Sequence, residues 1–363
     1  MAAEQSPTML KVSGNILLFY VYDIGDDVDL DTIRKKNFVK IADTPLSPFF
    51  KHYHVPLSFR FKDENEEQDL VKHGGHCLFR KVYNFGVISF CYRIPYEESL
   101  EDLKHKLGAV KKKFDLLSKQ AANEAFQSIH SAINKPHFAN LEGSYVAVQI
   151  TPLPAITAEQ FRDENSPKIA SLLRLEMQTL SERQRTEVLS ATTSYYGQDM
   201  IIVDTNVALI YDDEFFEPLE FFESASIEKL ELQYFDRVLD EKLNYFYAQS
   251  SYKIPLIAYI PFMSSQVDLP VSRLAKLRVD ISVVTERLEN SVTSSGDFYF
   301  SNFYAILVDR FFIKEWRDSI NRKLDIIKDL YTVYQDRLDT IHEEFLSLVI
   351  IILIVMEVLL VVR

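Results

Sequence analysis

The chain has 363 residues, of which 47% are hydrophobic and 26% are charged, so a wholly disordered protein is excluded. Its formal net charge of −13 argues against a general nucleic-acid binder, because such proteins usually carry a basic surface. The length allows two domains, or one domain with an extension.

The first half of the chain alternates between strand and helix patterns. Asn15–Tyr22 is apolar, β-branched and aromatic, which predicts a buried strand. Asp29 is a candidate N-cap for a helix that ends at Lys36. Pro95 is expected to end a strand, and a helix is expected from Glu98 to about Asn134. Other strands are predicted over residues 55–61, 77–94 and 143–150.

The next part of the chain extends the same mixed pattern. A helix is predicted over residues 167–194 and another over 227–247, from the spacing of their apolar residues. Two strands, 200–203 and 207–211, flank a tight turn at Asp204–Asn206. The apolar run 254–262 contains two prolines and is too short to span a bilayer, so we expect it to close the domain. Residues 1–262 are therefore predicted to form an α+β head domain with a mixed sheet.

Residues 263–344 read as a helical hairpin or coiled-coil stalk. Apolar residues recur at spacings of three and four from Leu274 to Val292, and again in a long helix that begins near Trp316. We expect the stalk to make the protein a homo-oligomer; the alternative is that its seam packs only within one chain. The seam of the second helix consists of Leu324, Ile327, Tyr331, Tyr334, Leu338 and Ile341.

The last stretch, residues 345–363, is predicted to be a single transmembrane anchor. Fifteen of the eighteen residues Phe345–Val362 are Leu, Ile, Val or Phe. A helix of that length spans about 27 Å, close to the ~30 Å hydrocarbon core of a bilayer. The alternative is a buried helix at the centre of an oligomer. The anchor positions are Phe345, Ile351, Leu353, Glu357 and Val362.

Glu357 is the one charged side chain in this apolar stretch. The seam of the stalk enters the stretch at Phe345 and Leu348 without a change of spacing. If the helices associate there, we expect Glu357 to repeat around the axis of the assembly, protonated or hydrogen-bonded to its neighbours.

The N-terminus favours a head domain in the cytoplasm. The first residues, MAAEQSPTMLK, have neither the pattern of a signal peptide nor the Arg-rich character of a transit peptide. Cys77 and Cys91 have no spacing that indicates a disulfide framework, which fits a reducing compartment. We therefore expect the head to remain on the side of the membrane where it is made.

Three polar clusters are candidates for chemistry. His52, His54, His73 and His76 could supply nitrogen ligands to a metal ion, but no Cys-x-x-Cys pair supports them. The aspartates from Asp23 to Asp31 do not fit a calcium loop and are better explained by a turn before a helix N-terminus. The lysines from Lys104 to Lys113 are read as a solvated helix face that Glu98, Glu101 and Asp102 balance.

Several short motifs, in order along the chain, resemble the "required for meiotic nuclear division" family of tail-anchored proteins. They are residues 23–25 with 28–30, 85–88, 230–240, 286–292, and Trp316 with Ile320, Arg322, Lys323 and Leu324. The resemblance implies an α+β head, a helical stalk and a C-terminal membrane segment. It also implies a link to the support of organellar translation, which the mitochondrial members of that family provide.

From these patterns we expect a non-enzymatic scaffold or tether at a membrane, with no cofactor, no direct nucleic-acid partner and an unidentified protein partner for the head. The alternative is a metal-dependent enzyme or metal sensor that uses the four histidines.

Overall fold

The computed structural model describes residues 11–42, 55–61, 70–138, 142–248, 279, 281 and 298–362. The chain divides into two compact units, of which one comprises Met1–Glu231 with Leu288–Lys314 and the other Leu232–Arg287 with Glu315–Arg363. The predicted end of the head at residue 262, the run 254–262 and nearly all of the first stalk seam lie outside the described residues.

The first unit contains a nine-stranded sheet in the order β3-β4-β5-β6-β1-β8-β11-β10-β9. Neighbouring strands are antiparallel except β8 and β11, which are parallel. The prediction of an α+β fold with a mixed sheet is therefore confirmed. The strands are β1 (Lys11–Asp23), β3 (Lys40–Ile41), β4 (Leu57–Arg60), β5 (His76–Val82), β6 (Val87–Ser99), β8 (Glu142–Ile150), β9 (Thr192–Thr193), β10 (Met200–Val203) and β11 (Val207–Tyr211). A separate short ladder joins β2 (Asp27–Val28) to β7 (Ile133–Asn134).

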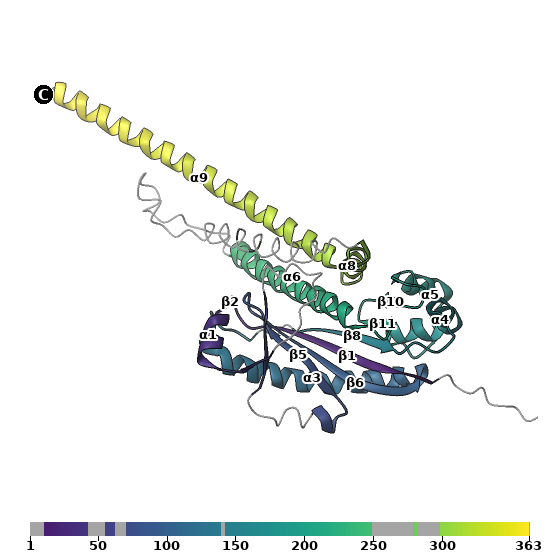
Figure 1. Cartoon of the computed structure of the whole chain (residues 1–363). Helices are drawn as coiled ribbons and strands as arrows, with labels where there is room; N and C mark the ends of the chain where they lie inside the picture. Colours follow the sequence, from purple (N-terminus) through teal and green to yellow (C-terminus); the bar gives the residue numbers. More distant parts are fainter. Residues whose placement is uncertain are drawn as a thin grey trace, which may run out of the picture. The chain divides into compact units, whose positions relative to one another are not determined.

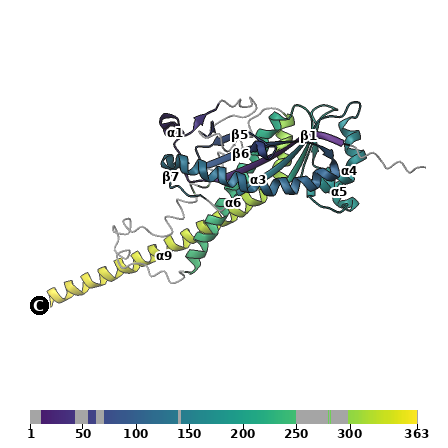
Figure 2. The same ribbon diagram turned by 90° about the horizontal axis from the view of Figure 1, so that it is seen from below.

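The central strand β1 shows how the two faces of the sheet are covered. Successive side chains of a strand point to opposite faces. The Tyr22 hydroxyl is 2.7 Å from the Ser118 hydroxyl of α3 (Leu100–Ile129). Phe19 points the other way, and its ring centroid is 6.0 Å from that of Phe222, in the first half of α6 (Phe216–Ala248). Helix α3 thus lies on one face and the first half of α6 on the other (Figures 1 and 2).

The prediction of one helix over residues 167–194 is wrong, because two helices occupy that region. Helix α4 (Ala158–Arg174) begins at a capping box between Thr157 and Gln160, so Pro167 lies inside it. It ends because Leu175 adopts a left-handed conformation, with φ 55°. Ser181 then caps α5 (Glu182–Leu189).

The expectation that Pro95 ends its strand is also wrong, because β6 continues to Ser99 and pairs with β1 throughout. Pairing with β5 stops at Arg93, so Pro95 lies where β6 has one neighbouring strand. A proline lacks the backbone N–H of the ladder but is tolerated at such an edge.

The remaining helices are α1 (Leu30–Lys36), η1 (His130–Ala132), α8 (Phe298–Arg310) and α9 (Ile313–Val361). Asp29 caps α1 as predicted, since its carboxylate accepts a hydrogen bond from the Thr32 backbone N–H at 3.0 Å. Arg310, the last residue of α8, ties this helix to α5, because its Nη1 lies 2.7 Å from Glu187 Oε1.

Candidate functional site

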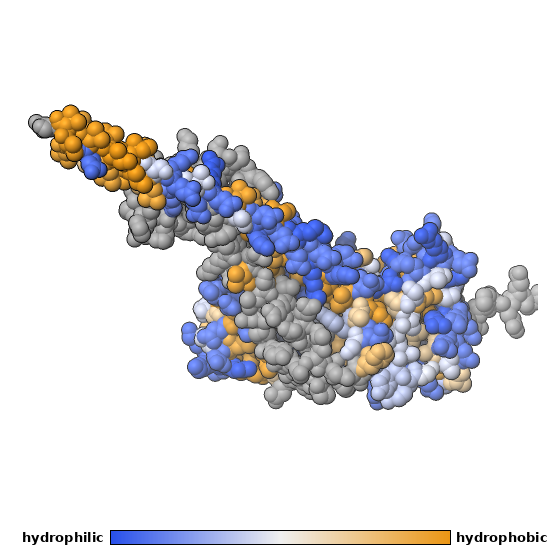
Figure 3. Space-filling model, turned by 90° about the horizontal axis from the view of Figure 1, so that it is seen from above, coloured by the Kyte–Doolittle hydropathy of each residue, from blue (hydrophilic) through white to orange (hydrophobic). Residues whose placement is uncertain are grey.

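The end of α9 is a continuous apolar segment. Asp339–Val361 is 23 residues long with a mean hydropathy of 2.8, and none of its apolar window is buried. At 1.5 Å per residue it measures about 35 Å, which is enough to cross a ~30 Å hydrocarbon core. Ile351, Leu353 and Val362 are 59%, 55% and 80% exposed, and Phe345 is half-buried. Figure 3 shows this end of α9 as an apolar surface. The prediction of one helix apolar enough to span a membrane is confirmed.

Glu357 is the one acidic side chain of the run Phe345–Val362; it lies near the C-terminal end of the segment and is exposed. Because α9 is unbroken, its 100° turn per residue places Glu357 roughly 150° around the helix from the mean direction of Phe345 and Leu348. An assembly that packs through this seam would therefore carry Glu357 on its outer face. This register argues against our expectation that Glu357 lies at the axis.

The first two seam residues of α9 are buried. Leu324 is 6% exposed and Ile327 is 1% exposed, whereas Ile341 is half-buried. The side chains of Tyr331, Tyr334 and Leu338 lie outside the described residues. The burial of Leu324 and Ile327 agrees with the predicted spacing of the seam. That the seam mediates self-association stays a prediction.

A polar clamp joins α9 to the second half of α6 within the second unit. The Lys323 ammonium lies 2.6 Å from a carboxylate oxygen of Asp236 and 2.6 Å from one of Asp240. The Ser319 hydroxyl also donates to Asp236, at 2.8 Å. The shared partner of both aspartates, Lys323, comes from another helix and lies more than eighty residues away in sequence.

The clamp brings together two of the segments on which the family resemblance was based. Residues 230–240 of α6 and 316–324 of α9 are linked by Lys323. Burial alone would lower the pKa of Lys323, but its hydrogen bonds to Asp236 and Asp240 outweigh burial and raise that pKa. Lys323 is consequently charged at neutral pH and fixes the register of the two helices.

The first half of α6 is held on the sheet by a buried ion pair. Glu223 of α6 and Lys81 of β5 are each 2% exposed, and their charged atoms lie 2.5 Å apart. The Tyr83 hydroxyl donates to Glu223 at 3.0 Å, and the Ser89 hydroxyl donates to the same oxygen. Burial, followed by the charge of Glu223, raises the pKa of Tyr83, so the phenol stays protonated as a donor. Breaking one partner of such a pair typically costs about 3–5 kcal/mol.

The predicted acidic cluster forms a structured loop at the end of β1. Asp23 is 3% exposed, and its Oδ2 lies 3.0 Å from Nε2 of His137. Asp26 pairs with Lys135 at 2.6 Å. The hydrogen bond that His137 donates to Asp23 raises the pKa of this histidine to about 9. These contacts agree with our interpretation of the cluster as a turn.

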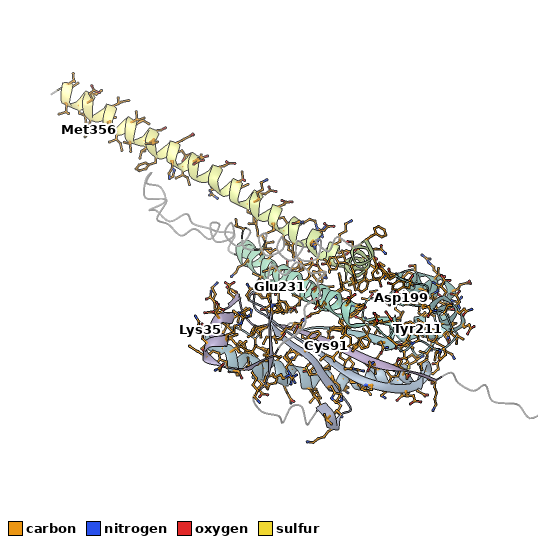
Figure 4. All side chains as sticks on the ribbon, viewed as in Figure 1. Lys35, Cys91, Asp199, Tyr211, Glu231 and Met356 are labelled. Carbon is orange, nitrogen blue, oxygen red and sulfur yellow. The ribbon has the colours of Figure 1, made fainter. Side chains whose placement is uncertain are left out.

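Glu231 of α6 (Figure 4) is 5% exposed. Burial raises its pKa well above the ordinary value, and the negative charges of Asp23 and Asp26 act in the same direction. Glu231 therefore holds a proton more readily than an exposed glutamate does.

The predicted metal ligands are not brought together among the described residues. His73 lies in the turn before β5 and His76 begins that strand, whereas His52 and His54 lie outside the described residues. Within the described ranges no group of three or more His, Cys, Asp or Glu side chains could hold a metal ion.

Two of the lysines of α3 pair with acids that we predicted to balance them. Lys106 lies 2.7 Å from Glu98 and Lys104 lies 3.3 Å from Glu101. Lys104 is also buried, and its ammonium donates to the backbone oxygen of Met177 at 3.4 Å. The prediction of a solvated face is therefore wrong for Lys104, whereas Lys112 and Lys113 are exposed as expected.

Comparison with known proteins concerns the head. The model of a family described as "Uncharacterized protein MJ0711, N-terminal domain" matches residues 13–217, from β1 to the beginning of α6. The "Uncharacterized protein MJ0711" of Methanocaldococcus jannaschii is 28% identical over 204 residues, which are 56% of this chain. The chain spans 61% of that relative's length. No solved structure matches the chain. The resemblance to the "required for meiotic nuclear division" family stays a prediction.

Proposed function

Because the chain belongs to the family of the MJ0711 N-terminal domain and ends in an exposed apolar helix, we propose that it is a membrane-anchored scaffold or tether without enzymatic activity. The α+β head is the part that binds a protein partner on the cytoplasmic side. The end of α9 crosses the bilayer once, and the stalk and anchor make the protein a homo-oligomer. The family match lies within the head, so the anchor rests on the chemistry of α9.

The observation that carries the proposal is the exposure of the apolar segment of α9 on all sides. A core helix of a water-soluble protein passes the same test of length and hydropathy, but it is mostly buried, whereas none of this window is buried. Its fifteen aliphatic and Phe residues contribute about −5 to −9 kcal/mol to insertion as an upper bound. That outweighs the penalty for Glu357, which is on the order of 3 kcal/mol.

The state of the cysteines supports a cytoplasmic head. Neither Cys77 nor Cys91 forms a disulfide, although β5 and β6, which carry them, are paired. Cys91 is fully buried, and burial raises the pKa of its thiol, which keeps it protonated and unreactive. Free thiols are typical of a reducing compartment.

Protease protection in intact cells or vesicles tests the orientation, and alkaline carbonate extraction of the same membranes tests the anchor. We expect the full chain to stay in the carbonate-washed membranes. A protease added from the cytoplasmic side should digest the head without prior permeabilisation. Release of the chain into the wash would contradict the anchor, and a head that is protected until detergent is added would contradict its orientation.

Self-association is tested by the mass of the detergent-solubilised full chain. The proposal predicts a mass above that of one chain plus detergent. A monomer at all protein concentrations would remove the homo-oligomer from the proposal, while leaving the anchor intact.

A further inference from the structure

The loop before β10 exposes two tyrosine side chains to solvent. Tyr195 and Tyr196 are 55% and 72% exposed. Asp199 is 9% exposed, and its carboxylate accepts the backbone N–H of Tyr195 at 2.8 Å and that of Tyr196. The backbone of this loop is therefore fixed by a buried acceptor, while both aromatic side chains remain outside the core. Exposed aromatic groups of this kind mark interaction surfaces.

The beginning of α8 extends the aromatic surface within the same unit. The ring centroid of Tyr299 lies 5.1 Å from that of Tyr195, in an edge-to-face arrangement. Phe298, the first residue of α8, is 88% exposed. Two segments far apart in sequence thus present neighbouring aromatic side chains.

Carboxylates border these rings. Met200 pairs with Tyr211 across β10 and β11, which places Asp199 beside Asp212 at the end of the hairpin. Asp213 and Glu214 follow and are exposed. In the described part of the chain, no Lys or Arg forms an ion pair with Asp212, Asp213 or Glu214. The negative charge of Asp199 raises the pKa of Asp212 in addition to the larger effect of burial, which agrees with their proximity.

We propose that this surface, formed by Tyr195, Tyr196, Phe298 and Tyr299 with Asp212, Asp213 and Glu214, binds an arginine-rich segment of a protein partner. A guanidinium stacks on aromatic faces and pairs with carboxylates at the same time, so its chemistry complements both parts of the surface. Lysine offers a point charge without the planar stacking and should bind more weakly. The inference rests on the proposed role of the head as the partner-binding part of the scaffold.

The test is fluorescence anisotropy of the detergent-solubilised full chain with labelled peptides of alternating arginine and alanine, lysine and alanine, or glutamate and alanine. The arginine peptide should bind tightest and the glutamate peptide should not bind. Tyr195→Ala with Tyr196→Ala should lower the affinity for the arginine peptide about tenfold, so that this peptide no longer binds more tightly than the lysine peptide. Asp213→Asn with Glu214→Gln should weaken both basic peptides.

A matched control is needed because a chain of net charge −13 attracts any basic peptide. Glu124→Gln with Glu182→Gln removes the same charge from exposed positions on α3 and α5 and should leave binding unchanged. Leu116→Ala removes an apolar side chain that is 66% exposed on α3 and should also have no effect.

Equal affinity in wild type and surface variants, or equal losses in the controls, would overturn the proposal. A second copy as occupant would appear instead as a dimer that the tyrosine variant dissociates, with no peptide binding. Carbonate extraction is independent of these results, so failure of the anchor is distinguishable from failure of this surface.

Discussion

Strand β1 and the end of α9 are both apolar runs, yet they lie in opposite surroundings. Leu17 and Phe19 of β1 are at most 1% exposed, whereas Leu353 and Ile354 of α9 are each 55% exposed. β1 has a paired strand on each side and a helix on each face, which together remove its side chains from water. The same residue types can thus build a core or require another apolar solvent, and the strands and helices packed around them decide which.

Charged side chains repeat this difference. Within the head, Lys81 is buried but reaches Glu223, so the cost of its burial is offset by an ion pair. In the apolar part of α9, Glu357 has no partner among the described residues. Water can solvate Glu357 in the isolated chain, whereas in a bilayer it would need a proton or a neighbouring donor.

The largest expected effect comes from placing a charge in each apolar run. Leu17→Lys buries an unpaired ammonium on the face of the sheet that α6 covers, and we expect it to remove about 4–5 kcal/mol or more of the free energy of unfolding of the head. Leu353→Lys should leave that free energy unchanged, because the site is exposed. Denaturant titration of the solubilised chain, followed by circular dichroism, measures both. Equal losses would mean that Leu353 belongs to a packed core.

The ion pair under α6 gives the next largest effect. Glu223→Gln leaves Lys81 buried without its counter-ion and should lower the free energy of unfolding by about 3–5 kcal/mol. Replacing both, as Lys81→Met with Glu223→Leu, should restore part of the lost stability. The remaining loss arises because the hydroxyls of Tyr83 and Ser89 no longer have Glu223 as an acceptor. The same titration measures this series, and a single variant as stable as wild type would contradict a dry ion pair.

The clamp between α6 and α9 should contribute less because Asp240 is half exposed. Lys323→Met removes the ammonium shared by Asp236 and Asp240, and we expect a loss of about 1 kcal/mol in the second unit. Lys328→Met, five residues further along α9, is the matched control, since Lys328 is exposed and makes no ion pair among the described residues. Hydrogen exchange of the backbone amides of α9 reports the difference. Identical protection in both variants would argue against the clamp.

A pH dependence is expected at the end of β1. The pKa of His137 is raised from 6.5 to about 9 in the folded head, mainly by its hydrogen bond to Asp23. The stabilisation from this pair is therefore fully present below pH 6.5 and is lost as the pH rises through about 9. Denaturant titrations between these values should show a decline that His137→Gln lacks. A wild type with a flat profile would contradict the pairing.

Local signals in the sequence predicted the elements that are governed by local chemistry. The apolar run of β1, the strands β10 and β11 and the Asp29 cap all lie where the pattern places them. The predictions failed where neighbours decide the outcome. Pro95 continues its strand because β5 has already stopped, and the break after α4 depends on the left-handed backbone of Leu175.

The buried pairs were missed for a related reason. Lys81 and Glu223 are 142 residues apart, and Lys323 reaches Asp236 over 87 residues. A lysine in the buried end of β5, or aspartates four residues apart on α6, indicates that a partner exists but does not identify it. The apolar segment of α9 needed no partner to be recognised, because composition and length alone define it.

Co-flotation with phosphatidylcholine vesicles tests the central claim most directly. The full chain is reconstituted from detergent, treated with alkaline carbonate and centrifuged through a density gradient, beside Ile351→Lys with Leu353→Lys as the variant. Two charges near the centre of the span cost about 5–7 kcal/mol. We predict that the wild type rises with the vesicles and that the variant stays at the bottom with its head still folded. A wild type that stays at the bottom, or a variant that floats equally well, would contradict the anchor.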